Sequence, residues 1–240
     1  MKPNPAQRKK AAARIAGRPQ PARRKILIVD DHSVVREGLC ATINRERDLT
    51  VCGAARDVAE AMDAVPKLQP DLVLADISLP GRSGLELIKD LRALYRRLPV
   101  LILSMHDESL YAERALRAGA RGYITKEAPP AELLRAIRQV LTGHVYVSAQ
   151  TSERILKWFS GDRTATPVSP VESLSDREFE ILQLIGAGRA PKDIATQLHL
   201  SPKTVAVHNA NIRQKLKLRT SGELIRFAVQ WEDMRNLGTM

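Results

Sequence analysis

The chain has 240 residues and a formal net charge of +11, with 44% hydrophobic and 27% charged residues. This length is sufficient for two small domains, each with a hydrophobic core of its own. No apolar run approaches the roughly 18 residues that a membrane-spanning helix needs, and no signal-peptide segment precedes the first domain. We therefore expect a cytoplasmic protein without a membrane partner.

The basic charge is concentrated at the start of the chain. Residues 1–25 contain nine Lys or Arg and no acidic residue, and prolines stand at positions 3, 5, 19 and 21. This composition is typical of disorder, so we expect a disordered basic tail over residues 1–24 that adds non-specific attraction to polyanions. The net charge is therefore weak support for a nucleic-acid-binding domain.

Five short apolar runs alternate with helical patterns over residues 25–145. Such alternation is typical of a parallel sheet with helices on both faces, and it predicts a doubly wound, flavodoxin-like α/β domain with five strands. The expected strands are 25–30, 49–55, 71–76, 99–104 and 121–126, and the expected helices lie near 33–45, 57–68, 84–94, 107–118 and 129–142.

Polar residues stand where these strands end. Asp30 and Asp31 follow the first strand, Asp76 follows the third, Ser104 closes the fourth and Lys126 closes the fifth. In an open parallel sheet these ends meet at one edge, which is where such folds bind ligands. Each residue alone has an ordinary explanation, such as a helix cap or a solvated side chain, but these explanations account poorly for all five together.

Three crowded carboxylates repel one another, and a divalent cation removes that repulsion. Ligation by oxygen alone, with room for waters, suits Mg²⁺, so we expect Asp30, Asp31 and Asp76 to bind this ion. A carboxylate beside Mg²⁺ can attack phosphorus and form an aspartyl phosphate. We therefore expect Asp76 to be the phosphoacceptor, with Ser104 and Lys126 holding the phosphoryl oxygens.

These motifs resemble the receiver domain of bacterial two-component response regulators over about residues 25–145. The matching segments are IVDDH (28–32), D-x-x-L-P (76–80), Ser104 and YITK (123–126). The resemblance implies that a sensor histidine kinase phosphorylates Asp76. It also implies a switch hydroxyl at Ser104, a phosphoryl-binding Lys126 and a switch aromatic at Tyr123, for which a half-exposed strand aromatic is the alternative.

An enzyme of the haloacid-dehalogenase type is a competing interpretation. Those phosphatases also use a strand-end Asp, but they need a second Asp two residues later as the general acid. Position 78 is Ser, which disfavours this reading. We expect no catalysis beyond the protein's own phosphorylation and slow hydrolysis.

A linker is expected over residues 146–172. It contains a short amphipathic segment with Ile155, Leu156, Trp158 and Phe159, and it ends in the Pro/Ser/Thr-rich stretch TATPVSPVES. This stretch is typical of a boundary between domains.

Residues 173–235 predict an all-α helix-turn-helix domain. Ser175 and Glu178 form a capping-box pattern that begins a helix ending near residues 186–188. A second helix is expected near 191–198, and Ser201 with Pro202 predicts the N-cap and first residue of a third. A helix, a short turn and a capped helix are the elements of a helix-turn-helix.

The third helix has two distinct faces at 100° per residue. Val205, Ile212 and Leu216 fall on one side and should face the core. The opposite side has small residues in its middle and cations at its ends, which suits a DNA major groove, and its lack of aromatic residues disfavours single strands. This side comprises Lys203, Ala206, Val207, Ala210, Arg213, Gln214 and Lys217. His208 lies on the flank, where a structural hydrogen bond is the expected role.

Residues 172–231 resemble the LuxR-type DNA-binding domain of NarL/FixJ-type regulators. The resemblance implies a four-helix module whose third helix reads duplex DNA, with Thr204 and Asn209 added to the contact residues. It also implies dimerisation through the last helix, for which internal packing is the alternative. The dimerisation residues would be Leu224, Phe227, Ala228 and Trp231. The family usually carries Lys at position 206, often Lys or Ser at 210 and often Arg at 209, so the operator sequence is not implied.

Taken together, the sequence predicts a DNA-binding transcriptional regulator that is switched by phosphorylation and forms a homodimer when phosphorylated or bound to DNA. One alternative is a phosphorylation-independent DNA-binding regulator whose receiver is a dimerisation or ligand platform. A third possibility is output through protein partners with weak DNA binding.

Overall fold

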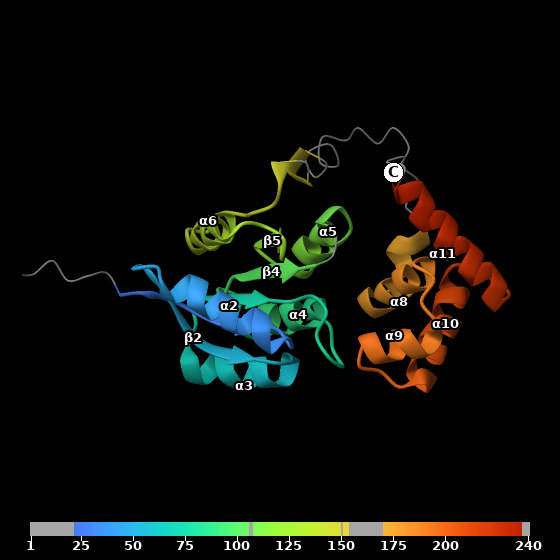
Figure 1. Ribbon diagram of the computed structural model, residues 1–240, viewed down its shortest axis with the longest axis horizontal. Helices are drawn as coiled ribbons and strands as arrows, with labels where there is room; N and C mark the ends of the chain where they lie inside the picture. The colour runs from blue at the N-terminus through green and yellow to red at the C-terminus, as the bar shows by residue number, and fades with distance from the viewer. Residues whose placement is uncertain (1–21, 106–107, 150, 154–169, 237–240) are drawn as a thin grey trace, which may run out of the picture.

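The computed structural model describes residues 22–105, 108–149, 151–153 and 170–236 (Figure 1). The expected tail lies almost entirely outside these residues, as does the amphipathic segment with Ile155 and Trp158. The described part contains an α/β domain, from β1 to α6, followed by a helical domain, from η1 to α11. None of its helices is both long and apolar enough to cross a membrane.

The α/β domain is built on a parallel sheet of five strands in the order β2-β1-β3-β4-β5, within the described residues. Adjacent strands in this order are all paired in parallel. This confirms the predicted sheet. The strands are β1 (Arg24–Val29), β2 (Leu49–Ala55), β3 (Leu72–Ala75), β4 (Val100–Ser104) and β5 (Gly122–Thr125).

Helices cover both faces of the sheet, because the central strands are apolar on both sides. Ile26 and Ile28 of β1 point into a cluster that contains buried residues of α2 and α6. Leu27 and Val29 point into the opposite cluster, which contains residues of α3, α4 and α5. The helices are α2 (Ser33–Asn44), α3 (Val58–Leu68), α4 (Gly84–Leu94), α5 (Glu108–Ala118) and α6 (Pro130–Leu141).

Two helices of the helical domain begin at the caps that the sequence predicts. Ser175 and Glu178 form a complete capping box before α8, and the Ser201 hydroxyl accepts a hydrogen bond from the Thr204 amide at 3.0 Å. Pro202 is the first residue of α10, as predicted. The elements are η1 (Pro170–Ser173), α8 (Asp176–Gly186), α9 (Pro191–Gln197), α10 (Pro202–Lys215) and α11 (Ser221–Asn236).

One expectation about α10 is wrong. The 100° pattern places Lys217 on the face of a continuous third helix, but the helix ends at Lys215. Lys217 has φ +57°, a left-handed conformation that a helix does not contain. Its side chain therefore follows the turn after the helix and not the regular spacing of α10.

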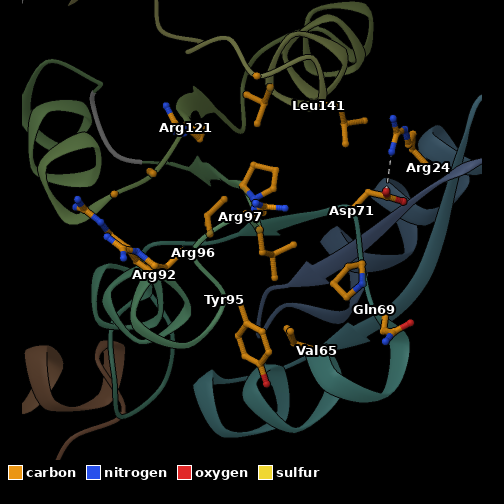
Figure 2. Close-up of a pocket in the computed structure, with 18 of the residues that line it drawn as sticks. Arg24, Val65, Gln69, Asp71, Arg92, Tyr95, Arg96, Arg97, Arg121 and Leu141 are labelled. Carbon is orange, nitrogen blue, oxygen red and sulfur yellow. Dashed lines mark hydrogen bonds and ion pairs between the residues drawn. The ribbon is translucent and has the colours of Figure 1, made fainter.

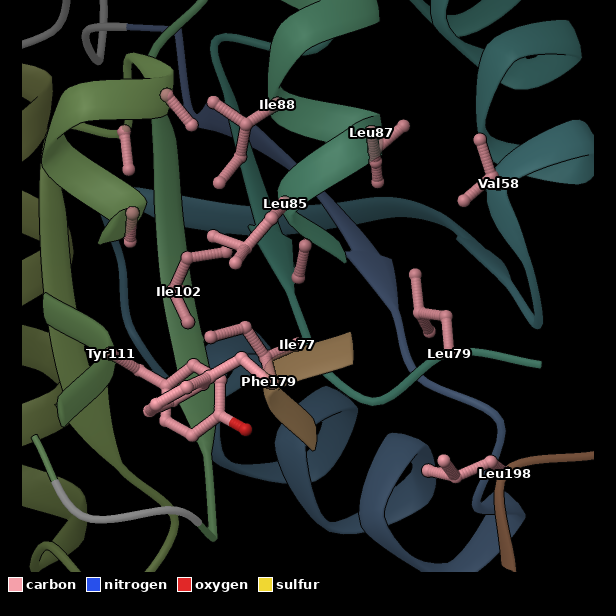
Figure 3. Close-up of a cluster of buried hydrophobic side chains, with 14 of the residues drawn as sticks. Val58, Ile77, Leu79, Leu85, Leu87, Ile88, Ile102, Tyr111, Phe179 and Leu198 are labelled. Atoms are coloured by element: carbon pink, nitrogen blue, oxygen red, sulfur yellow. The ribbon is translucent and has the colours of Figure 1, made fainter. Parts of the chain in front are cut away.

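The two domains pack against each other through α8. Phe179 of α8 forms an edge-to-face contact with Tyr111 of α5, with ring centroids 5.3 Å apart. Figure 3 shows these two rings beside Ile77, which directly follows Asp76 in the chain. All three side chains belong to one buried hydrophobic cluster that continues from the α/β domain into the helical domain. The domain contact is thus a continuation of the core.

Candidate functional site

The carboxyl ends of β1 and β3 place two carboxylates side by side. Val29 and Ala75 are register partners in the two strands, so the residues that follow them, Asp30 and Asp76, are neighbours. Both side chains are buried, at 1% and 3% exposure. The amide of Asp76 donates to the Val29 carbonyl at 2.8 Å, and Asp30 Oδ1 accepts from the His32 amide at 2.8 Å. Backbone hydrogen bonds therefore hold this pair in place.

Lys126 joins the two carboxylates from the end of β5. Its Nζ atom lies 2.6 Å from Asp30 Oδ2 and 2.7 Å from Asp76 Oδ2. Burial lowers the pKa of Lys126, but the carboxylates outweigh this effect and hold its pKa above the ordinary value. Burial raises the pKa of Asp76, and the charge of Asp30 adds to this rise, against the lowering effect of Lys126. The ammonium therefore opposes the effect of burial and favours the charged form of Asp76.

The pocket has the donor set of a cation site. Asp30, Asp31, His32 and Asp76 each offer one ligand atom, and these atoms lie within 4.8 Å of one another. Lys126 contacts two of the three carboxylates, so negative charge remains that a divalent cation can neutralise. The carboxylate oxygens fit Mg²⁺. His32 was not predicted from the sequence: its Nδ1 lies 2.8 Å from Asp31 Oδ1, but its ring is mostly exposed.

Ser104 and Tyr123 are both fully buried, at 0% exposure. Ser104 is the last residue of β4 and is the register partner of Thr125, which directly precedes Lys126. The burial of Tyr123 contradicts the alternative of a half-exposed strand aromatic. The switching roles of both residues remain predictions.

A close backbone contact supports the pocket from the other side of Asp76. The amide of Gly84, at the start of α4, donates to the Ile77 carbonyl at 2.7 Å. A Cβ atom at position 84 would lie 2.1 Å from the Asp76 carbonyl oxygen. Only glycine lets α4 begin this close to the loop that follows Asp76.

A large hollow of about 1110 Å³ lies at the opposite, amino-terminal edge of the sheet. Figure 2 shows the arginines that line it: Arg24, Arg92, Arg96, Arg97 and Arg121. The helices of the fold end at this edge, and cations complement the partial negative charge of helix C-termini. This favours arginines at this edge, and we assign the chemistry to the acidic pocket.

The predicted DNA-contacting face of α10 is open to solvent. Val207 is 54% exposed, and the side chains of Lys203, Ala206, Ala210 and Gln214 are also exposed, as is Lys217 in the turn after the helix. Thr204, Asn209 and Arg213 are half-buried. On the other side, Val205 and Ile212 are at 0% exposure and Leu216 packs against them, which confirms the predicted core face. His208 Nδ1 has no hydrogen-bond partner among the described residues, so the expected hydrogen bond is absent at that atom.

The predicted dimerisation residues on α11 are mostly internal. Leu224, Ala228 and Trp231 are at 2%, 0% and 5% exposure, and Phe227 is half-buried. Trp231 packs edge-to-face on Phe179, with centroids 5.5 Å apart. This burial favours the internal-packing alternative for these side chains. The exposed large hydrophobic residues of α11 are Ile225, Val229 and Met234.

The contact between the domains was not foreseen from the sequence. Arg114 of α5 donates to the Val171 and Leu174 carbonyls at 2.9 and 3.1 Å, and its guanidinium lies 4.1 Å from the Phe179 ring centroid. Lys89 of α4 pairs with Asp176 at 3.0 Å. The Tyr111 hydroxyl also donates to the Gln183 side chain. These side chains come from ordinary helical surfaces, so sequence spacing carries no signal for them.

The helical domain also reaches the acidic pocket itself. His199, in the turn between α9 and α10, has its Nε2 3.4 Å from Asp31 Oδ2. His199 has φ +53°, in the left-handed region, so the turn rather than a helix presents this side chain. Only the tertiary arrangement brings it to Asp31.

Comparison with known families and proteins agrees with both halves of this description. Residues 26–138 match the response regulator receiver domain, and residues 172–228 match the LuxR family of bacterial regulatory proteins. The chain is 40% identical over 210 residues to the oxygen regulatory protein NreC of Staphylococcus aureus, which covers 86% of this chain and 97% of that protein.

Two solved structures of similar fold are response regulators, one matching 58% of this chain and the other 86%. A LuxR-family two-component response regulator from Aurantimonas sp. SI85-9A1 is 36% identical, with a TM-score of 0.54 over 58% of this chain and 99% of its own. RcsB from Salmonella enterica serovar Typhimurium, bound to the promoter rprA with phosphomimetic BeF3-, is 23% identical with a TM-score of 0.56. That match covers 86% of this chain and 98% of RcsB, and it supports the fold alone.

Proposed function

Because the chain belongs to the response regulators that join a receiver domain to a LuxR-family DNA-binding domain, we propose that Asp76 is the phosphoacceptor that controls its DNA binding. The observation that carries this proposal is the geometry of Lys126, whose ammonium contacts both Asp30 and Asp76. The protein is a DNA-binding transcription regulator, and the acidic pocket is where its phosphorylation would take place.

The reaction follows from the contacts of Asp76. One carboxylate oxygen attacks the phosphorus of a phosphohistidine on a sensor kinase, so that an O–P bond forms as the P–N bond breaks and the imidazole leaves with the electron pair. Lys126 then faces the new phosphoryl oxygens with its positive charge. Asp30, Asp31 and Asp76 would hold Mg²⁺, which supplies charge neutralisation for the transferring group. Slow hydrolysis of the acyl phosphate would complete the cycle.

DNA would be bound by the exposed side of α10. Lys203 stands at the start of the helix and Arg213 near its end, where phosphates flank a major groove, and Ala206, Val207 and Ala210 lie between them. Small side chains allow close approach to base edges and thymine methyl groups. Thr204, Asn209, Gln214 and Lys217 complete the set that we propose.

Dimerisation would use the outer side of α11. Ile225 and Val229 are one helical turn apart and exposed, at 54% and 38%, in contrast to the buried Leu224 and Ala228. Such a stripe suits pairing with the same stripe of a second copy. The inner side of α11 would then support the dimer by fixing the position of this helix, and most of its side chains would not touch the partner. These side chains are Leu224, Phe227, Ala228 and Trp231.

Intact mass tests the proposal after incubation with a small-molecule phosphodonor, with and without Mg²⁺. The wild type should gain one phosphoryl group only with Mg²⁺, and Asp76→Asn should gain none. Asp90→Asn is the matched control, because Asp90 is a surface carboxylate paired with Arg82. It should be phosphorylated like the wild type.

The absence of an adduct on wild type would overturn the proposal and favour a regulator whose receiver acts only as a platform. An equal adduct on Asp76→Asn would place the phosphoacceptor elsewhere.

A further inference from the structure

The hollow at the amino-terminal edge of the sheet has a one-sided charge that the proposed function does not use. Its lining contains five arginines and a single acidic residue, Asp71 (Figure 2). The Asp71 carboxylate is already occupied, because Oδ1 accepts from Arg24 Nη1 at 2.9 Å and Oδ2 accepts from the Lys25 amide at 2.8 Å. No carboxylate of the lining is therefore left for the other four arginines. They are Arg92, Arg96, Arg97 and Arg121.

These four guanidinium groups are unpaired. None of them has a hydrogen bond or an ion pair with another residue in the part of the chain that the structure describes. Elsewhere in the receiver, surface arginines pair with carboxylates, as in Arg56–Glu60, Arg82–Asp90 and Arg138–Asp48. The arginines of the hollow thus keep all of their N–H groups available to a ligand.

Helix ends favour cations at this edge of the sheet but offset only part of the charge. The C-terminal turns of α3, α4, α5 and α6 all contribute to the lining. Each helix C-terminus is equivalent to about −0.5 charge, so the four ends together supply about −2. The five arginines and Asp71 supply a net charge of +4. About two positive charges therefore remain for an anion to neutralise.

Arg92 packs against the turn that leads to Arg121. A Cβ atom at Gly119 would lie 2.6 Å from Arg92 Cδ and 3.3 Å from Arg92 Nη1, so a side chain at this position would push Arg92 away. Gly119 has φ +119°, a conformation that glycine adopts without steric cost. The turn after α5 therefore leaves room for the arginine of α4 close to the segment that presents Arg121.

We propose that this hollow binds a small anion that carries two or more phosphate groups. Guanidinium groups pair with phosphate oxygens through two parallel N–H···O bonds, and several of them on one concave surface favour a ligand with several phosphates. The hollow is large enough for such a ligand, at about 1110 Å³. An extended duplex fits a concave site less well than a compact ligand does. The binding residues are Arg92, Arg96, Arg97 and Arg121.

The site is separate from the acidic pocket. The hollow lies at the amino-terminal edge of the sheet, and Asp76 follows the carboxyl end of β3. Binding should therefore need neither Mg²⁺ nor phosphorylation. A nucleoside polyphosphate and an inorganic polyphosphate share the chemistry that the arginines recognise, and Tyr95, Leu98 and Pro99 of the lining would pack against the base of the former.

Isothermal titration calorimetry of the full chain tests the site, in EDTA so that no Mg²⁺ bridges the ligand to the acidic pocket. Inorganic tripolyphosphate should bind at one high-affinity site, about tenfold or more tighter than orthophosphate, because several arginines contact one ligand. Arg96→Gln combined with Arg121→Gln should weaken the binding of tripolyphosphate by about tenfold or more. Asp76→Asn should bind it like the wild type, which separates this site from the proposed phosphoacceptor.

Arg45→Gln combined with Arg47→Gln is the matched control. Both arginines are exposed in the turn between α2 and β2 of the same domain, have no side-chain partner among the described residues and do not line the hollow. This variant removes the same charge and should bind tripolyphosphate within about twofold of the wild type. Melting temperatures without ligand check that both double variants are folded.

Equal binding by the Arg96 and Arg121 double variant and by the wild type would overturn the proposal. An equal loss in the Arg45 and Arg47 double variant would also overturn it and assign the binding to overall positive charge. Loss of affinity for duplex DNA, with tripolyphosphate binding intact, would replace the small anion with a DNA contact. Titration with ATP identifies the source of the phosphates: tighter binding than tripolyphosphate indicates a nucleotide, and weaker binding indicates an inorganic chain.

Discussion

At the scale of single residues, the site is a set of charges that burial makes interdependent. Asp30 and Asp76 are almost completely buried and share one ammonium, that of Lys126. Removing one partner of such a group leaves a buried charge uncompensated, which costs about 3–5 kcal/mol. The same logic extends to Glu180, where burial and the nearby carboxylates disfavour the charged form.

The pH dependence of stability tests the state of Glu180. Its pKa in the folded protein is about 7, above the ordinary value of 4.5, so the folded form holds this proton more tightly than the unfolded form. The stability that this proton contributes is fully present below pH 4.5 and is lost as the pH rises through 7. The melting temperature of wild type should therefore fall more over this interval than that of Glu180→Gln.

The groups that face Glu180 are present in both proteins, so their titration cancels in the comparison. They are Tyr111 of α5, Asp76 at the end of β3, and Asp176 and Arg177 of α8 itself. Parallel melting curves for the two proteins would contradict the raised pKa of Glu180.

At the scale of elements, local sequence signals determine where helices begin. Ser175 with Glu178, and Ser201 with Pro202, predict the starts of α8 and α10 because hydroxyl caps satisfy the free amides of a first turn. Helix ends are less well predicted, as Lys217 shows. This residue is in the left-handed conformation directly after α10, although the 100° pattern of side chains continues through it. The 100° pattern reflects only which side chains are polar or apolar. The turn after α10 depends instead on how the next helix, α11, packs.

The N-cap of α10 can be tested by substitution. Ser201→Ala removes the acceptor for the Thr204 amide and should destabilise the helical domain by about 1 kcal/mol. Ser201→Asn keeps a side-chain oxygen at this position and should retain most of the stability. Chemical denaturation of the full chain measures both, and equal stability of Ser201→Ala and wild type would show that the cap contributes nothing.

The contribution of Lys203 on α10 to DNA binding can be measured through the salt dependence of affinity. Lys203 is exposed in the first turn, where a phosphate contact carries no sequence information. Lys203→Ala should weaken binding to all duplexes alike and reduce the slope of log affinity against log salt by about 1. Lys67→Ala, at the end of α3 in the receiver, is the control and should leave the slope unchanged. An unchanged slope in Lys203→Ala would remove this lysine from the interface.

At the scale of the whole molecule, the sequence predicts both folds and the acidic pocket but not the relation between domains. Strand-end positions are fixed by chain order in a parallel sheet, so Asp30, Asp76 and Lys126 could be assigned from one sequence. The contacts of Tyr111, Arg114 and His199 involve residues that are far apart in the chain, and no spacing encodes them. The burial of Leu224 and Trp231 on α11 likewise depends on α8, which packs against that side.

The central claim is that the charge state of Asp76 controls DNA binding, and one titration tests it most directly. The duplex is first selected from random-sequence DNA by the full chain treated with phosphodonor and Mg²⁺. Its affinity is then measured for the phosphorylated and unphosphorylated chain and for Asp76→Ala under both conditions. We predict tighter binding by the phosphorylated wild type and no response in Asp76→Ala. Equal affinity of the two wild-type forms, with the adduct verified by mass, would contradict the account.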